Sequence, residues 1–169
     1  VIGDPNPDIY GNISLNFNFK QRLNVSLGFK YSLGNDVYNY QRALLEGGSM
    51  FINQTNAVKR RWAAEGQVTD IPRVTYGDTM GNSQFSDRWI EDGSFLKLKN
   101  VTVSYKIPIR NEYIQGLTVW AAANNLFTLT KYLGADPEVS CGNGVLMQGI
   151  DAGYLSAGRS FHLGVKINL

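Results

Sequence analysis

The sequence SDRWIEDGSFLKLKNVTVSYKIP, residues 86–108, contains the pattern that decides the fold. From Val101 to Ile107 every second residue is apolar, and the residues between them are polar. Side chains of a β-strand point alternately to opposite faces, whereas a helical stripe repeats about every 3.6 residues. Pro108 has no backbone N–H for a ladder hydrogen bond. The stretch therefore predicts a strand with one apolar and one polar face, ending at a turn.

Four further segments show the same alternation and are predicted to be antiparallel strands of one sheet. They comprise residues 12–20, 23–32, 117–124 and 160–169. Only Gln21 and Arg22 separate the first two, which predicts a tight hairpin. Residues 95–100 alternate in a different phase from residues 101–107, which predicts a β-bulge near Asn100. The chain is thus expected to be all-β and antiparallel.

Three other segments lack this alternation. Residues 1–10 are rich in Pro, Gly and Asp, which is typical of irregular connecting chain. Residues 34–93 form a connection far longer than usual, and such connections are normally functional or locally structured. Two short helices are expected inside it, at residues 40–46 and 56–65, the second ended by Gly66. Residues 132–157 are predicted to be a second long loop.

Composition excludes several classes of function. The net charge of +2 is too small to indicate a nucleic-acid partner. The single cysteine, Cys141, has no second thiol and no histidine cluster with which to bind a metal. No run approaches the roughly 18 consecutive apolar residues of a transmembrane helix, so strands would have to make any membrane crossing. The sequence begins without a targeting segment, so we expect a mature product or part of a longer protein.

The connections alternate in length along the chain. Those after the first and third predicted strands are short, and those after the second and fourth are long. This is the arrangement of an outer-membrane β-barrel, which has short periplasmic turns and long extracellular loops. The polar face consists mainly of Asn, Ser, Thr, Gly and Lys, which suits a hydrated lumen. The residues predicted to face lipid are Val101, Tyr105, Leu163 and Val165, and those predicted to face the lumen are Ser104, His162 and Lys166.

No catalytic, cofactor or metal site is predicted, and the protein is not expected to be an enzyme. His162 is the only histidine, so it is expected to be a hydrogen-bonded residue of the lumen wall rather than part of a catalytic triad. Asp87, Glu91 and Asp92 lie beside Arg88 and are expected to form solvated ion pairs.

Besides residues 86–108, the sequence contains the motifs GDPNPD (3–8), GNDVYN (34–39), RRWAAEG (60–66), TDIPR (69–73) and NNLFTLTKYLGADPEV (124–139). Together these motifs resemble the C-terminal end of SusC/RagA-type TonB-dependent transporters of the Bacteroidetes. The resemblance covers essentially the whole chain. It implies that residues 1–169 are the C-terminal part of a barrel of about 22 strands, without its N-terminal plug domain. One departure is Leu169, which stands where such strands usually end on an aromatic residue.

The resemblance also implies a location in the bacterial outer membrane. Five strands cannot close a barrel, because known ones begin at about eight strands. The implied partners are the remainder of the same barrel, outer-membrane lipid, a SusD-like surface lipoprotein, and the TonB complex acting through the missing N-terminal part. No nucleic-acid partner and no cofactor is expected.

The predicted function is therefore that of an energised importer for large nutrients. The resemblance favours oligosaccharides as substrates, with peptides as the near alternative. The alternative from a different class of function is a non-energised porin or an outer-membrane barrel enzyme. Only the importer requires a plug domain. A soluble lipocalin-like binder would need about eight strands. The candidate contacts with substrate or partner are Trp62, Trp89, Arg88 and Tyr154, although both tryptophans are more readily explained by packing within the long loop.

Overall fold

The computed structural model describes residues 1–109, 113–138, 140–142 and 144–168. The chain forms two compact units. One, the sheet unit, comprises Pro7–Gly34, Ser94–Lys131 and Ser156–Leu169. The other, the loop unit, comprises Val1–Asn6, Asn35–Gly93 and Tyr132–Leu155.

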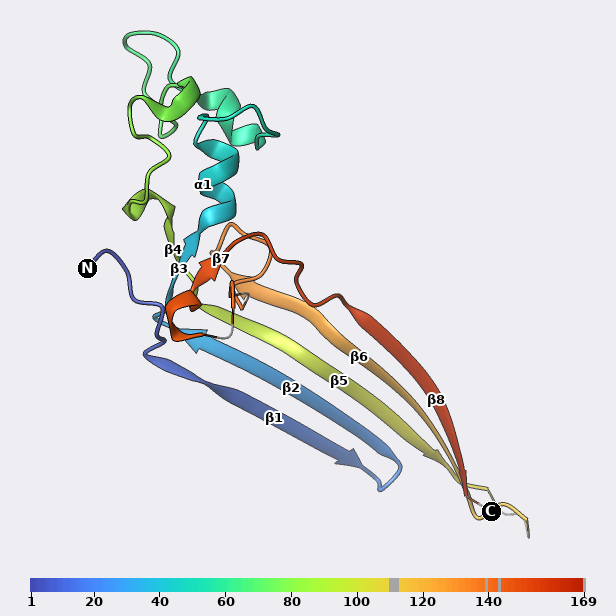
Figure 1. Cartoon of the computed structure of the whole chain (residues 1–169). Helices are drawn as coiled ribbons and strands as arrows, with labels where there is room; N and C mark the ends of the chain where they lie inside the picture. The colour runs from blue at the N-terminus through green and yellow to red at the C-terminus, as the bar shows by residue number, and fades with distance from the viewer. Residues whose placement is uncertain (110–112, 139, 143, 169) are drawn as a thin grey trace. The chain divides into compact units, whose positions relative to one another are not determined.

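The sheet unit contains the five strands that the alternating segments predict. They lie in the order β1-β2-β5-β6-β8, and each pairs with its neighbours in antiparallel fashion (Figure 1). Their bounds are Ile9–Phe19, Leu23–Leu33, Phe95–Ile107, Gly116–Thr130 and Ser160–Asn168. The predicted end of the last strand, Leu169, lies outside the described residues. The all-β, antiparallel prediction is confirmed.

The strand register gives the sheet one apolar face. Directly opposed residues share a face. Val101 lies opposite Leu27 and Ala123, and Val165 lies opposite Val119, so the apolar residues continue from strand to strand. Much of this face is exposed, including 86% of Leu163 and 61% of Val165.

The other face is mainly polar. Ser104 lies opposite Asn24, and Lys166 lies opposite Thr118. His162, opposite Ala122, has its Nε2 atom 3.2 Å from the hydroxyl of Ser160. The register thus separates the residues predicted to face the lumen from those predicted to face lipid.

The predicted bulge in β5 is present. The register shifts between Leu98 and Asn100, which leaves Lys99 as the extra residue against β2. On the other side, β6 compensates at Asn125, whose φ angle is +53°, a value that Asn tolerates better than most residues. Beyond the bulge the apolar face continues through Leu96 and Leu98. The change of phase in the sequence therefore keeps one apolar face along the whole strand.

Three predicted boundaries are wrong. β1 begins at Ile9 inside the segment expected to be irregular, because its first residues pair with the end of β2. The first hairpin has a turn at residues 20–22 rather than a two-residue connection, with Lys20 and Gln21 both in the left-handed conformation. β6 runs on to Thr130, beyond the predicted end at residue 124, because the bulge shifts the phase of its alternation.

The loop unit has its own small sheet, of order β4-β3-β7, which the sequence pattern does not predict. Its strands are Ile90–Asp92, Asp36–Asn39 and Ile150–Asp151. Helix α1, Tyr40–Glu46, confirms the first predicted helix, and the side chain of Asn39 caps it by accepting from the N–H of Arg42. Short 3-10 helices are η1 (Asn56–Arg60), η2 (Tyr76–Asp78), η3 (Asp87–Trp89) and η4 (Val145–Met147).

The second predicted helix, residues 56–65, is wrong in type and length. The 3-10 helix η1 ends at Arg60, because Arg61 adopts an extended ψ angle of 150°. Val58 on η1 is buried and belongs with Val37, Ile71 and Trp89 to the apolar core of the loop unit. Among the described residues, no helix is long and apolar enough to cross a membrane.

Candidate functional site

A partly buried ion-pair network ties together the elements of the loop unit. Arg42 on α1 donates from Nε to Glu46 at 2.9 Å and from Nη1 to Glu91 on β4 at 2.7 Å. The other carboxylate oxygen of Glu91 accepts from the backbone N–H of Leu133 at 2.9 Å. Burial alone would lower the pKa of Arg42, but the hydrogen bonds to Glu91 and Glu46 outweigh it and raise that pKa. The network therefore links the first long loop to the start of the second.

This arrangement corrects the prediction of solvated ion pairs around Arg88. Glu91 pairs with Arg42 instead of Arg88, and the Glu91 side chain is only 10% exposed. Within the described part of the chain, Nη2 of Arg88 is buried without a hydrogen-bond partner. The pKa of Arg88 is lowered, first by burial and then by the positive charge of Arg42.

Trp89 contacts both of these cations. The guanidinium of Arg88 stands 4.6 Å from the centre of a Trp89 ring, and that of Arg42 stands 5.6 Å from it. The indole N–H donates to the backbone carbonyl of Gln84 at 3.1 Å, and the side chain is 0% exposed. In this structure Trp89 packs inside the loop unit and presents no surface to a ligand.

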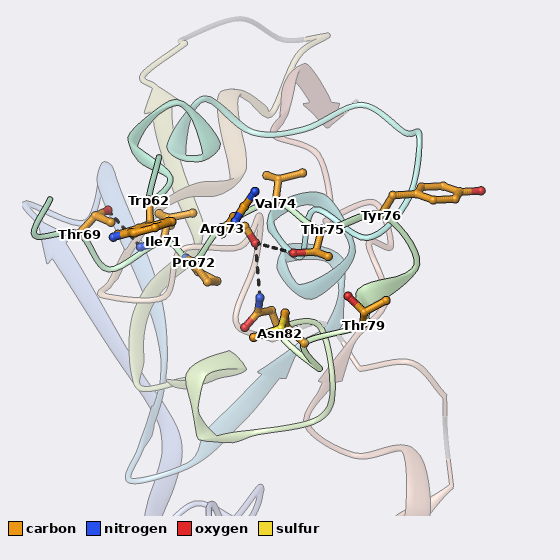
Figure 2. A pocket seen from close by; sticks show the side chains of 11 residues that line it. Trp62, Thr69, Ile71, Pro72, Arg73, Val74, Thr75, Tyr76, Thr79 and Asn82 are labelled. Atoms are coloured by element: carbon orange, nitrogen blue, oxygen red, sulfur yellow. Dashed lines mark hydrogen bonds between the residues drawn. The ribbon is translucent and has the colours of Figure 1, made fainter. Parts of the chain in front are cut away.

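A cavity of about 850 Å³ lies in the loop unit, and we call it the Trp62 cavity. Figure 2 shows its wall, which comes from residues 62–82. Its apolar lining consists of Trp62, Ile71, Pro72, Val74, Tyr76 and Met80. Its polar lining consists of Thr69, Arg73, Thr75, Thr79 and Asn82. The mixture is suited to a ligand with both apolar faces and polar edges.

Local hydrogen bonds hold the wall of the cavity. The N–H of Trp62 donates to the carbonyl of Ile71 at 2.9 Å. The carbonyl of Arg73 accepts from Thr75 and from the side-chain amide of Asn82, as the dashed lines in Figure 2 show. The turn that carries Asn82 is fixed by Asp78, whose pKa is lowered by hydrogen bonds from Ser83. Residues 62–82 thus form one folded wall.

The four predicted contact residues do not form one group. Trp62 lines the Trp62 cavity, whereas Arg88 and Trp89 stack on each other outside its lining. Tyr154 does not line the cavity, and its hydroxyl lies 4.0 Å from Sγ of Cys141. Sequence reasoning missed Arg73 and Asn82, although the motif TDIPR marked the turn in which Arg73 lies. Among the described residues, no group of His, Cys, Asp or Glu side chains is arranged to hold a metal ion.

Comparisons with known proteins give the family. No family model matches the chain. The sequence is 30% identical over 175 residues to TonB-dependent receptor P3 of Formosa agariphila, covering 99% of this chain and 17% of that receptor. It is 26% identical to TonB-dependent receptor SusC of Bacteroides thetaiotaomicron, covering 96% of this chain and 15% of SusC. The chain belongs to the SusC/RagA-type TonB-dependent receptors.

The structure gives the same family. The RagAB peptide importer in its closed-closed state matches with a TM-score of 0.79 and 26% identity, over 99% of this chain and 18% of that one. The chain thus spans less than a fifth of the length of these relatives. The open sheet, with β1 and β8 at its edges, corresponds to a segment of the barrel of these SusC/RagA-type relatives.

Proposed function

We propose that this chain forms part of the wall and of the extracellular loops of an energised importer for large nutrients in the bacterial outer membrane. The exposed apolar face of the sheet carries the proposal. Soluble monomers rarely expose large contiguous apolar patches, whereas a barrel wall must present one to lipid. The polar face, with Ser104, His162 and Lys166, then lines the hydrated lumen.

The family of this chain supports the partners that we propose for it. In the whole receptor, further strands complete the barrel, and a SusD-like lipoprotein covers the loops from outside. The TonB complex supplies energy through a plug domain and an N-terminal segment. This chain would be the C-terminal part of that barrel. The relatives are named as receptors and importers, which fits a chain without a catalytic role.

Oligosaccharides are the substrates we favour, because the Trp62 cavity combines an indole with hydroxyl and amide side chains. Peptides are the second candidate, and one observation favours them: the similar RagAB is a peptide importer. A porin or a barrel enzyme is the alternative from a different class. A plug domain encoded upstream of these residues would exclude both.

Growth of bacteria that carry the intact receptor tests this function. Trp62→Ala should reduce growth on one polymeric nutrient and leave the amount of receptor in the outer membrane unchanged. Trp89→Ala should lower the amount of receptor, because losing a buried Trp costs about 3–5 kcal/mol of stability. If deleting the receptor impairs growth on no polysaccharide or peptide source, the importer proposal is wrong.

A further inference from the structure

The Trp62 cavity has a positive wall. Among the described residues that line it, Arg73 is the only charged one. Two aspartates nearby in sequence are engaged elsewhere: Asp70 pairs with Arg60 at 3.6 Å, and Asp78 accepts from the hydroxyl of Ser83 at 2.6 Å. Within the described part of the chain, the guanidinium of Arg73 forms no ion pair. The cavity therefore offers one uncompensated cation to a ligand.

The lining of this cavity also offers side-chain groups for hydrogen bonding. The carbonyls of Ile71 and Arg73 already accept hydrogen bonds from the cavity's own wall. Among the described residues, nothing pairs with the hydroxyl of Thr79 or with Oδ1 of Asn82. A sugar is bound through its hydroxyls and the apolar face of its ring, and these side chains together with the Trp62 indole offer contacts of both kinds. The wall therefore suits a sugar.

We propose that the Trp62 cavity binds a uronic acid residue of an acidic oligosaccharide. The carboxylate pairs with the guanidinium of Arg73, since an Arg fork matches the geometry of a carboxylate. Trp62 supplies an apolar surface for the sugar ring, and Thr79 and Asn82 receive the ring hydroxyls. This inference rests on the proposed import function and names the class of substrate.

Binding to the intact receptor in detergent tests the proposal, with an oligogalacturonide as the probe. Its methyl ester serves as the matched neutral ligand, and a glutamate-rich peptide of equal charge serves as the peptide ligand. Arg73→Gln should weaken binding of the oligogalacturonide about tenfold, the loss expected for one charge-assisted hydrogen bond. Arg73→Lys should recover part of that loss. Lys59→Gln, which removes an equal charge outside the cavity lining, should have no effect.

The methyl ester should bind more weakly than the acid to the unmodified receptor and respond little to Arg73→Gln. Equal weakening of both sugars would overturn the role of the carboxylate. Tighter binding of the acidic peptide than of the oligogalacturonide would show that the ligand of the cavity is a peptide and not a sugar. If the unmodified receptor binds neither acid yet still supports growth on a polymeric nutrient, the cavity proposal fails while the importer proposal survives.

Discussion

At the scale of single residues, the loop unit depends on buried polar groups that are paired across long sequence separations. The hydroxyl of Tyr132 donates to Asp151 at 2.7 Å, and the N–H of Gly153 donates to the other carboxylate oxygen at 2.8 Å. Asp151 is 2% exposed. The pKa of Tyr132 is raised, first by burial and then by this hydrogen bond, so the phenol remains a donor at physiological pH.

Tyr132→Phe should therefore destabilise the loop unit. The change removes one donor and leaves a buried carboxylate oxygen unsatisfied, which costs about 1–3 kcal/mol. Hydrogen exchange of the backbone amides around β7 in the intact receptor measures this loss as faster exchange. Tyr154→Phe is the control, because among the described residues the hydroxyl of Tyr154, which is exposed, contacts only Sγ of Cys141, at 4.0 Å. Equal exchange in both variants would show that the hydrogen bond contributes little.

Long-range pairing also explains which residues of the site could be predicted from the sequence and which could not. Trp62 lies in the cavity, and its neighbourhood was marked by local motifs. Arg88, by contrast, was matched with the acids next to it in sequence. The actual partner of Glu91 is Arg42, 49 residues away, a pairing that no local pattern reveals. Arg73 was missed because its role depends on which partners the neighbouring aspartates bind, and this is a property of the tertiary structure.

At the scale of elements, the strands were predictable because a two-residue period is a local signal that a strand of nine or more residues repeats many times. The β4-β3-β7 sheet was missed because strands of two to four residues contain too little alternation to detect. The glycines within strands carried no readable signal either. Gly164 on β8 lies opposite Trp120 on β6, and a side chain at Gly164 would collide with the indole.

Gly164→Val should therefore weaken the pairing of β6 with β8. The added side chain must displace the Trp120 indole, and overpacking of this kind costs about 1–3 kcal/mol. The midpoint of urea unfolding of the intact receptor measures the change. In a Trp120→Ala background the same substitution should cost much less, because the space is then vacant. Gly158→Val, where an added Cβ meets nothing within 4 Å, is the matched control.

At the scale of the whole molecule, the sheet is amphipathic and open at β1 and β8. Unpaired strand edges and a continuous apolar face are both unfavourable in water. Completion of the barrel removes the first problem and lipid removes the second. The proposed membrane location thus accounts for two features of the sheet with one environment.

Val165→Arg should impair assembly of the receptor in the outer membrane. An arginine on the lipid face near the middle of the bilayer costs about 2–4 kcal/mol. His162→Arg is the matched control: it places the same side chain on the same strand but on the polar face, and it should assemble normally. The heat-modifiable fraction of receptor in outer-membrane preparations measures assembly. Equal loss in both variants would contradict the assignment of the faces.

The two ends of the sheet carry connections of different length. The register brings the long connections β2–β5 and β6–β8 to one end of the sheet, and the β1–β2 turn to the opposite end. An epitope tag inserted after Gly66, whose surroundings are open, should bind antibody on intact cells. The same tag in the turn at residues 20–22 should bind only after the outer membrane is permeabilised. The two insertions control for each other, because each is made at an exposed turn in the same receptor. The reverse staining pattern would show that the barrel has the opposite orientation. The Trp62 cavity would then not lie at the cell surface, where an imported polymer first meets the receptor.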